Sequence, residues 1–163
     1  MTPSKETSHM IKLVKRLLAD NNINLLLCGF SIAQNLSKGL KRHFRIIGIN
    51  ILGQVFGKLK DSKNNIVEAA QETLKCLIGS LSIDDFMEDI RSGLDDKAPV
   101  MKCQTMRFVN NLARRRDTKV KNALKQLLDR LVKMTEDGSA EVRKQSVGLL
   151  SQLKITFGSE FVR

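Results

Sequence analysis

The stretch Asp137-Gly138-Ser139-Ala140-Glu141-Val142-Arg143 is one of four related stretches in this chain of 163 residues. Each stretch opens with an aspartate, at Asp20, Asp61, Asp96 and Asp137, and the separations between these residues are 41, 35 and 41. A self-similarity of this period is typical of repeat proteins whose unit is a pair of helices. The four aspartates therefore define a repeat register, and other positions can be counted from them.

Four further positions, counted from each register aspartate, agree in chemistry. The residue six before it and the residue five after it are apolar, the residue nine after it is small or fairly small, and the residue sixteen after it is leucine. These sets are Val14, Val55, Ile90 and Leu131; Leu25, Ile66, Met101 and Val142; Gly29, Ala70, Thr105 and Ser146; and Leu36, Leu77, Leu112 and Leu153. The apolar positions predict the buried stripes of a first and a second helix, and the small residue lets helices approach closely. The pattern predicts an all-α fold: a right-handed α-solenoid of four HEAT-type helical hairpins, similar to the superhelix of armadillo repeats.

The helix signals place eight helices in one domain that covers residues 1–163. The predicted helices are 8–19, 23–38, 42–60, 65–80, 83–94, 99–115, 118–135 and 140–156, in repeats at 8–38, 42–80, 83–115 and 118–156, with tails at 1–7 and 158–163. Asn65 and Glu68 have the spacing of a capping box, in which Asn65 would be the N-cap. Pro99 is suited to a first helical turn, and Ser139 is a good N-cap for the last helix.

No group of residues in the sequence has the spacing of a catalytic, metal or phosphate-binding site. Cys28, Cys76 and Cys103 are an odd number without a CxxC pair, which disfavours disulfides and zinc and favours buried, reduced thiols. His9 and His43 have no triad or ligand pattern around them, and the acidic residues near Asp84 suit a helix N-terminus. We therefore expect a protein that is not an enzyme and has no cofactor or metal. No apolar run reaches the ~18 residues of a membrane span.

The charge of the chain predicts an acidic partner. The net charge is +11, and the sequence pI is about 9.9. In a stack of helical hairpins, the turns within repeats lie at one edge and the turns between repeats at the other. The within-repeat candidates are Asn21, Asn22, Lys60, Lys63, Asn64, Lys97, Lys102 and Arg143, which are interspersed with the register aspartates. The between-repeat candidates, an alternative and more basic edge, are Lys41, Arg42, Arg114, Arg115, Arg116 and Lys119. A solvated rim and a surface that holds nucleic-acid phosphates are both compatible with these turns.

Four stretches, in this order and spacing, resemble elements of one known family. These are Gly39-Leu40-Lys41-Arg42-His43-Phe44, Lys58-Leu59-Lys60-Asp61-Ser62-Lys63-Asn64-Asn65-Ile66-Val67, Asp96-Lys97-Ala98-Pro99-Val100-Met101-Lys102 and the stretch 137–143. Over residues 10–155 the chain resembles the last four repeats of the TOG domains of microtubule polymerases of the ch-TOG and Msps class. It departs from the family in having four repeats instead of six, no Trp, and Asn64 where a Pro is expected.

The resemblance implies a tubulin-binding module that grips αβ-tubulin with its within-repeat turns and acts in microtubule dynamics or spindle organisation. It implies a cytoplasmic location on the cytoskeleton, at microtubules, spindle or centrosome. If the chain is part of a larger domain, we expect Ile11, Val14 and Leu18 to form an exposed apolar face that another repeat would cover. A generic HEAT scaffold that grips another protein and a basic solenoid that binds nucleic acid stay open as alternatives.

Overall fold

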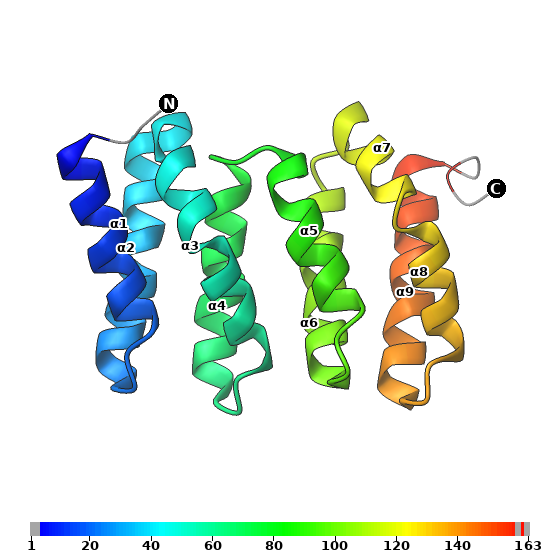
Figure 1. Ribbon diagram of the computed structural model, residues 1–163. Helices are drawn as coiled ribbons and strands as arrows, with labels where there is room; N and C mark the ends of the chain where they lie inside the picture. The colour runs from blue at the N-terminus through cyan, green and yellow to red at the C-terminus, as the bar shows by residue number, and fades with distance from the viewer. Residues whose placement is uncertain (1–3, 159–160, 162–163) are drawn as a thin grey trace. The chain divides into compact units, whose positions relative to one another are not determined.

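The structure, a computed structural model, describes residues 4–158 and residue 161, and every regular element within them is a helix (Figure 1). The α-helices are α1 (Lys5–Leu18), α2 (Ile23–Leu40), α3 (Arg45–Gly57), α4 (Asn64–Ile78), α5 (Ile83–Leu94), α6 (Pro99–Ala113), α7 (Thr118–Lys125), α8 (Leu128–Lys133) and α9 (Ala140–Phe157). Three short 3₁₀ turns join them, η1 (Lys41–Phe44), η2 (Lys58–Lys60) and η3 (Met134–Glu136). The all-α prediction is confirmed. Over the described part of the chain, no helix has both the length and the apolarity that a membrane crossing requires.

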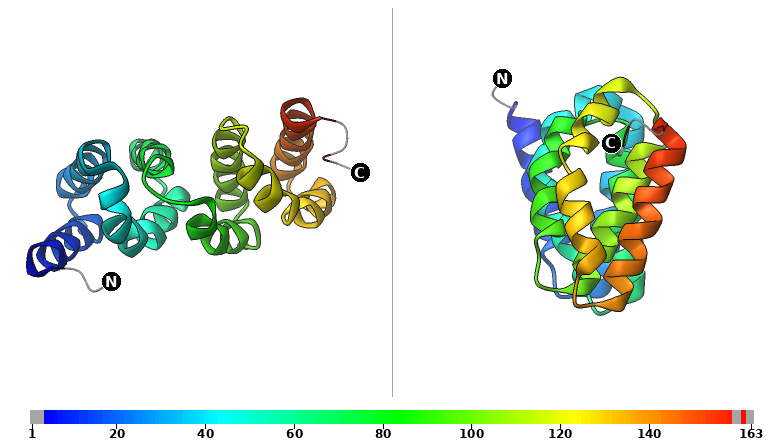
Figure 2. Two further views of the ribbon diagram at one scale, coloured as in Figure 1. Left: turned by 90° about the horizontal axis from the view of Figure 1, so that it is seen from above. Right: turned by 90° about the vertical axis from the view of Figure 1, so that its right-hand side faces the viewer.

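The helices belong to two compact units, one ending at Phe86 and the other starting at Met87. In the first unit, α2 packs against α1 and α4, and α3 packs against α1, so that α1 and α3 form one layer and α2 and α4 the other (Figure 2). In the second unit, α9 packs against both α6 and α8. Each unit therefore contains paired helices, as the repeat pattern predicts.

Most of the predicted boundaries are confirmed, and the exceptions have local causes. The predicted helix 118–135 bends at Gln126, where two i→i+3 backbone bonds tighten the chain and separate α7 from α8. The predicted capping box is wrong: Lys63 is the N-cap of α4, and Asn65 lies inside its first turn. The predictions for Pro99 as the first residue of α6 and for Ser139 at the N-cap of α9 are confirmed.

The two ends of the chain also differ from the prediction. Helix α1 begins at Lys5, where its N-cap Ser4 accepts a hydrogen bond from the backbone N–H of Thr7 at 3.2 Å. Phe161, placed in the C-terminal tail, is fully buried, and its ring stacks on Phe157 with 5.1 Å between ring centroids. The predicted tail residues 1–3, 159–160 and 162–163 lie outside the described residues.

The repeat register corresponds to the core, apart from one helix. All four residues six positions before the register aspartates are fully buried, and so are all four small residues nine positions after them. Leu25 breaks the pattern, because 43% of it is exposed, and Leu36 is only half-buried. Both belong to α2. Helix α4 packs against α2, and α9 packs against α6, but no helix pair precedes α2 among the described residues.

The prediction that Ile11, Val14 and Leu18 form an exposed apolar face is wrong. Ile11 is 8% exposed, and Val14 and Leu18 are completely buried, because α1 turns this stripe towards α2 and α3. The exposed large apolar side chains of the first hairpin are instead Leu13, Leu25 and Leu40. A periodic apolar stripe identifies the buried side of an amphipathic helix, so these three residues face the core of their own hairpin.

We expect Gly29→Ala to destabilise the protein, although the same change normally stabilises a helix interior. A Cβ at Gly29 would lie 2.8 Å from the Cβ of Leu17, where α2 crosses α1. This clash should cost about 1–3 kcal/mol in the free energy of unfolding, measured by urea titration. The matched control is Gly148→Ala in α9, where a Cβ meets open space and should stabilise by about 0.5–1 kcal/mol. Equal effects at the two glycines would contradict the close approach of α1 and α2.

Candidate functional site

The four register aspartates make the same hydrogen bond. In each within-repeat turn, the Oδ1 atom of the aspartate accepts from the backbone N–H two residues further on, at distances of 2.7, 3.0, 2.8 and 2.9 Å. The donors are the N-cap residues of the following helices, Asn22, Lys63, Ala98 and Ser139. This side-chain bond imitates a backbone turn and fixes where the next helix begins. The residue between acceptor and donor is exposed in every case: Asn21, Ser62, Lys97 and Gly138.

Both within-repeat turns of the first unit lie at the same end of its helices (Figure 1). The predicted residues there, Asn21, Asn22, Lys60, Lys63 and Asn64, are all exposed. The side chain of Asn22 already makes one hydrogen bond: it accepts from the backbone N–H of Asn24 at 2.9 Å and caps α2. The structure therefore brings these five polar residues together at one end of the unit.

A hollow of about 420 Å³ separates the two turns of the first unit. Its lining includes Ala19, Gln54, Lys58 and Lys60. The amide of Gln54 donates to the backbone carbonyl of Lys15 at 3.3 Å and so joins α3 to α1 across the hollow. This end of the unit thus offers exposed lysines and amides around a shallow depression.

The within-repeat turns of the second unit also share one end, but charged pairs tie them together. The Nζ atom of Lys102 lies 2.5 Å from the Oδ2 atom of Asp137, and both side chains are mostly buried, at 19% and 16% exposed. Arg143 donates to the backbone carbonyls of Asp137 and Gly138, at 2.7 and 3.1 Å. Lys102 and Arg143, both predicted for the site, therefore hold the turn at 137–139. Lys97 remains exposed.

The corresponding hollow in this unit is smaller, at about 280 Å³, and is lined by charges. Arg130 stands seven residues before its register aspartate, as Gln54 does in the first unit, and its Nε atom lies 3.2 Å from a carboxylate oxygen of Asp95. The hydrogen bond from Lys102, followed by that from the backbone N–H of Ser139, holds the pKa of Asp137 below its ordinary value. The same position in the repeat is therefore a neutral amide in one unit and an ion pair in the other.

The between-repeat turns lie at the opposite end of the helices within each unit (Figure 1). Their predicted residues, Lys41, Arg42, Arg114, Arg115, Arg116 and Lys119, are all exposed. Lys41 and Arg116 have positive φ angles, 49° and 54°. The Nε atom of Arg115 lies 3.6 Å from a carboxylate oxygen of Asp117, which also caps α7 by accepting from the backbone N–H of Val120 at 2.8 Å.

The acidic residues at the start of α5 have structural partners. Asp85 forms a two-bond ion pair with Arg45, at 2.7 and 3.1 Å, and accepts from the backbone and side chain of Ser82. Burial acts to raise the pKa of Asp85, but the bonds from Arg45 and Ser82 outweigh it and keep that pKa below its usual range. Burial and the neighbouring Glu88 raise the pKa of Asp89. Asp85 thus secures the N-terminus of α5 to the start of α3.

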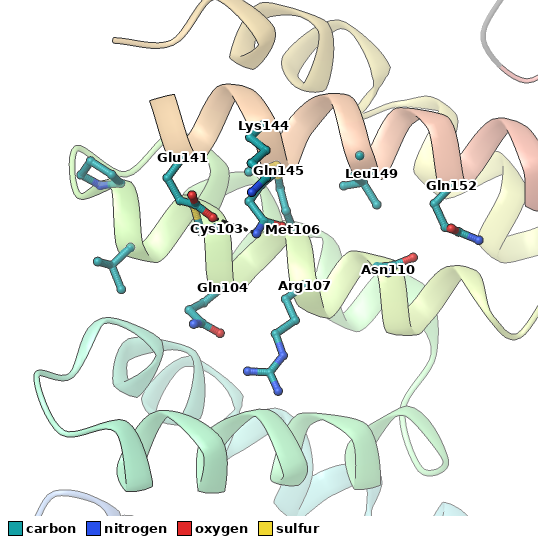
Figure 3. Close-up of a pocket in the computed structure, with 13 residues that line it drawn as sticks. Cys103, Gln104, Met106, Arg107, Asn110, Glu141, Lys144, Gln145, Leu149 and Gln152 are labelled. Carbon is teal, nitrogen blue, oxygen red and sulfur yellow. Dashed lines mark hydrogen bonds between the residues drawn. The ribbon is translucent and has the colours of Figure 1, made fainter. Parts of the chain in front are cut away.

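A groove of about 700 Å³ runs between α6 and α9 in the second unit and contains none of the predicted residues (Figure 3). Apolar residues such as Val100 and Leu149 contribute to its lining, and Asn110, Gln145 and Gln152 place amide groups along it. Gln145 donates to Glu141 at 3.0 Å within the same helix. The chemistry suits an apolar group flanked by hydrogen-bonding partners. Nothing in the repeat register indicates this groove, because its polar residues lie on the outward side of the helices.

The candidates for catalysis and metal binding are not brought together. Among the described residues, no three side chains of His, Cys, Asp or Glu are grouped as a metal ion requires. His9 and His43 are exposed, in α1 and η1. The prediction of buried thiols is wrong for Cys28, which is exposed, whereas Cys76 and Cys103 are half-buried. Partial burial raises the pKa of the Cys76 and Cys103 thiols, which keeps them protonated and poorly nucleophilic at neutral pH.

Comparison with known proteins identifies several relatives of the chain. No protein-family model matches the chain. The chain is 28% identical over 160 residues to Protein mini spindles of Drosophila melanogaster. This alignment covers 96% of this chain and 8% of that protein. It is 23% identical over 154 residues to Protein MOR1 of Arabidopsis thaliana, covering 93% of this chain and 8% of that protein. The chain therefore spans less than a tenth of the length of these curated relatives.

Two solved structures share the fold over almost the entire chain. One, described as "Structural Basis of Microtubule Plus End Tracking by XMAP215, CLIP-170 and EB1", is 27% identical with a TM-score of 0.81 and covers 99% of this chain and 67% of the other. The second concerns tubulin recruitment and assembly by microtubule polymerases with TOG domain arrays. It has the same TM-score at 17% identity, which is a likeness of fold alone, and covers 99% of this chain and 34% of the other.

Lys102→Met should destabilise the protein by about 1.5–3 kcal/mol at pH 7, since it removes a charged hydrogen bond and leaves the carboxylate of Asp137 without its lysine. A carboxyl group whose folded-state pKa is depressed stabilises the protein above the ordinary pKa of about 3.9 and loses this contribution as the pH falls through the depressed value. The difference between wild type and variant, measured by urea unfolding, should therefore shrink below about pH 4. Lys97→Met, at the exposed neighbouring turn, is the control and should change stability by less than about 0.5 kcal/mol. A difference that persists unchanged in acid would refute the role of the ion pair.

Proposed function

We propose that this chain is a HEAT-repeat domain of the TOG type, that it binds the αβ-tubulin dimer through its within-repeat turns, and that it catalyses no reaction. The observation that carries the proposal is the repeated turn: each register aspartate makes the same bond and leaves the next residue exposed. Because the turns have the same hydrogen bond, each repeat presents the same backbone geometry to a partner protein with a rigid surface. The similarity to mini spindles and to the plus-end-tracking structure supports tubulin as the partner.

The proposed contact residues divide into two groups. Asn21, Asn22, Lys60, Lys63, Asn64 and Lys97 are exposed and are proposed to touch tubulin. Lys102 and Arg143 are proposed to act indirectly, because their cationic groups already hold the turn at 137–139. Exposed lysines at an interface raise the association rate through long-range attraction and make it sensitive to salt. The chain as a whole, residues 1–163, is proposed to act as one binding domain.

The setting of this function follows from the same relatives. We place the protein at microtubules, including those of the spindle or centrosome, in the cytoplasm, where it would contribute to microtubule dynamics. No cofactor is part of the proposal, because an interface of turns binds by shape and charge. The between-repeat turns, which the sequence offers as an alternative edge, are not required for it.

Charge reversal in the within-repeat turns should separate this proposal from simple attraction of a basic protein to an acidic one. The double variant Lys63→Glu/Lys97→Glu should weaken binding to unpolymerised αβ-tubulin at least tenfold, measured by titration and by co-migration in size-exclusion chromatography at low and moderate salt. Both side chains are exposed, and neither variant disturbs a core contact.

The matched control is Lys12→Glu/Lys154→Glu, which changes the net charge equally at exposed positions outside these turns. It should retain most of the affinity. Equal loss in both double variants would show that only the overall charge matters. The absence of a complex with the wild-type chain at either salt concentration would reject tubulin as the partner.

A further inference from the structure

We infer that the turn between α6 and α7 is a second binding surface, specific for an acidic polypeptide segment, at the end of the second unit away from the within-repeat turns. This inference does not depend on tubulin binding. It concerns what we call the basic turn, formed by Arg114, Arg115, Arg116 and Lys119, all of which are exposed.

The basic turn has a large excess of positive charge. Residues 114–125 contain six basic residues and one acidic residue, Asp117. Asp117 is already used: it caps α7 through the backbone N–H of Val120 at 2.8 Å and lies 3.6 Å from Arg115. It can offset the charge of one neighbour at most. The guanidinium groups of Arg114 and Arg116 therefore contribute to an exposed patch that attracts anions.

The backbone of the basic turn is unfavourable for the residue that occupies it. Arg116 has a φ angle of 54°, in the left-handed region, where glycine is the usual residue after a helix C-terminus. An L-residue there is strained, because its Cβ comes too close to the backbone carbonyl oxygen. Lys41, in the between-repeat turn of the first unit, has a φ angle of 49°. Among the described residues, the non-glycine positions with positive φ are Lys41 and Arg116, and both are exposed basic residues. Backbone strain at an exposed residue indicates that its side chain has a function.

The side chains around the basic turn disfavour single-stranded nucleic acid as its partner. Base stacking needs exposed aromatic rings, but the chain has neither Trp nor Tyr. Six of its seven Phe residues are buried, and Phe157 is half-buried. Arginine presents a planar fork of N–H donors that matches a carboxylate, or a phosphate, with two parallel bonds. A flexible segment rich in glutamate or aspartate needs no base stacking, so it fits this surface better than a single-stranded nucleic acid does.

Binding of a fluorescent decaglutamate peptide to the full chain, followed by anisotropy, tests the inference. Arg114→Glu/Arg116→Glu should weaken binding more than tenfold, and the affinity of the wild type should fall as salt is raised. Lys63→Glu/Lys97→Glu is the matched control, with the same change in net charge in the within-repeat turns, and should leave peptide binding nearly unchanged. Equal loss in both double variants would overturn the inference.

Arg116→Gly provides a variant that we expect to stay folded. Glycine removes the charge and relieves the positive φ, so this variant should have a higher Tm than the wild type and a several-fold weaker affinity for the peptide. A higher Tm with unchanged affinity would reject Arg116 as a binding residue.

A duplex DNA of 20 base pairs, about two helical turns, is the competing probe. If the DNA binds more tightly than the peptide, the partner is nucleic acid and not an acidic polypeptide. Because the control variant targets the turns proposed to bind tubulin, failure of one proposal leaves the other testable.

Discussion

One short hydrogen bond, from the backbone N–H of an N-cap residue to the side chain of a register aspartate, determines much of this structure. Such a bond is accepted by each of Asp20, Asp61, Asp96 and Asp137. Each time, the following helix starts at the residue after the N-cap. Because helix starts are fixed relative to the aspartates, so are the faces that the helices present to each other. The apolar column six residues before and the small-residue column nine residues after fall into the core for this reason.

The same bond explains why the fold could be predicted from the sequence. Its acceptor is a residue type that is easy to recognise, and its spacing to the buried leucines at Leu77, Leu112 and Leu153 is constant. The predictions that were wrong depend on context outside the repeat. Leu25 has the right position in the register, but its helix has no preceding pair to pack against among the described residues. The bend at Gln126 depends on two backbone hydrogen bonds, and no residue type in the sequence indicates them.

The candidate site could be predicted less well, because sequence gives the location of a charged residue but not its partner. Lys97 and Lys102 stand five residues apart around one turn, and the pattern treats them alike. In the structure, Lys97 is exposed, while Lys102 is mostly buried against Asp137 from the next repeat. The groove between α6 and α9 was missed entirely, since its amides lie on faces that the register leaves unassigned. Pairing between neighbouring repeats, and not residue type, separates a contact residue from a structural one.

The local character of the aspartate turn also bears on how the chain acquires its structure. A bond that spans two residues forms without closing a long loop, and the helices that it joins are neighbours in sequence. Each hairpin can therefore begin to form early, but it becomes stable only when a neighbouring hairpin docks on it and covers its apolar face, as Lys102 and Asp137 help to do across 35 residues. Chains dominated by such near contacts fold fast, and folding can begin at any one of several equivalent places. A defect in one turn would then delay its own hairpin and leave the others free to start.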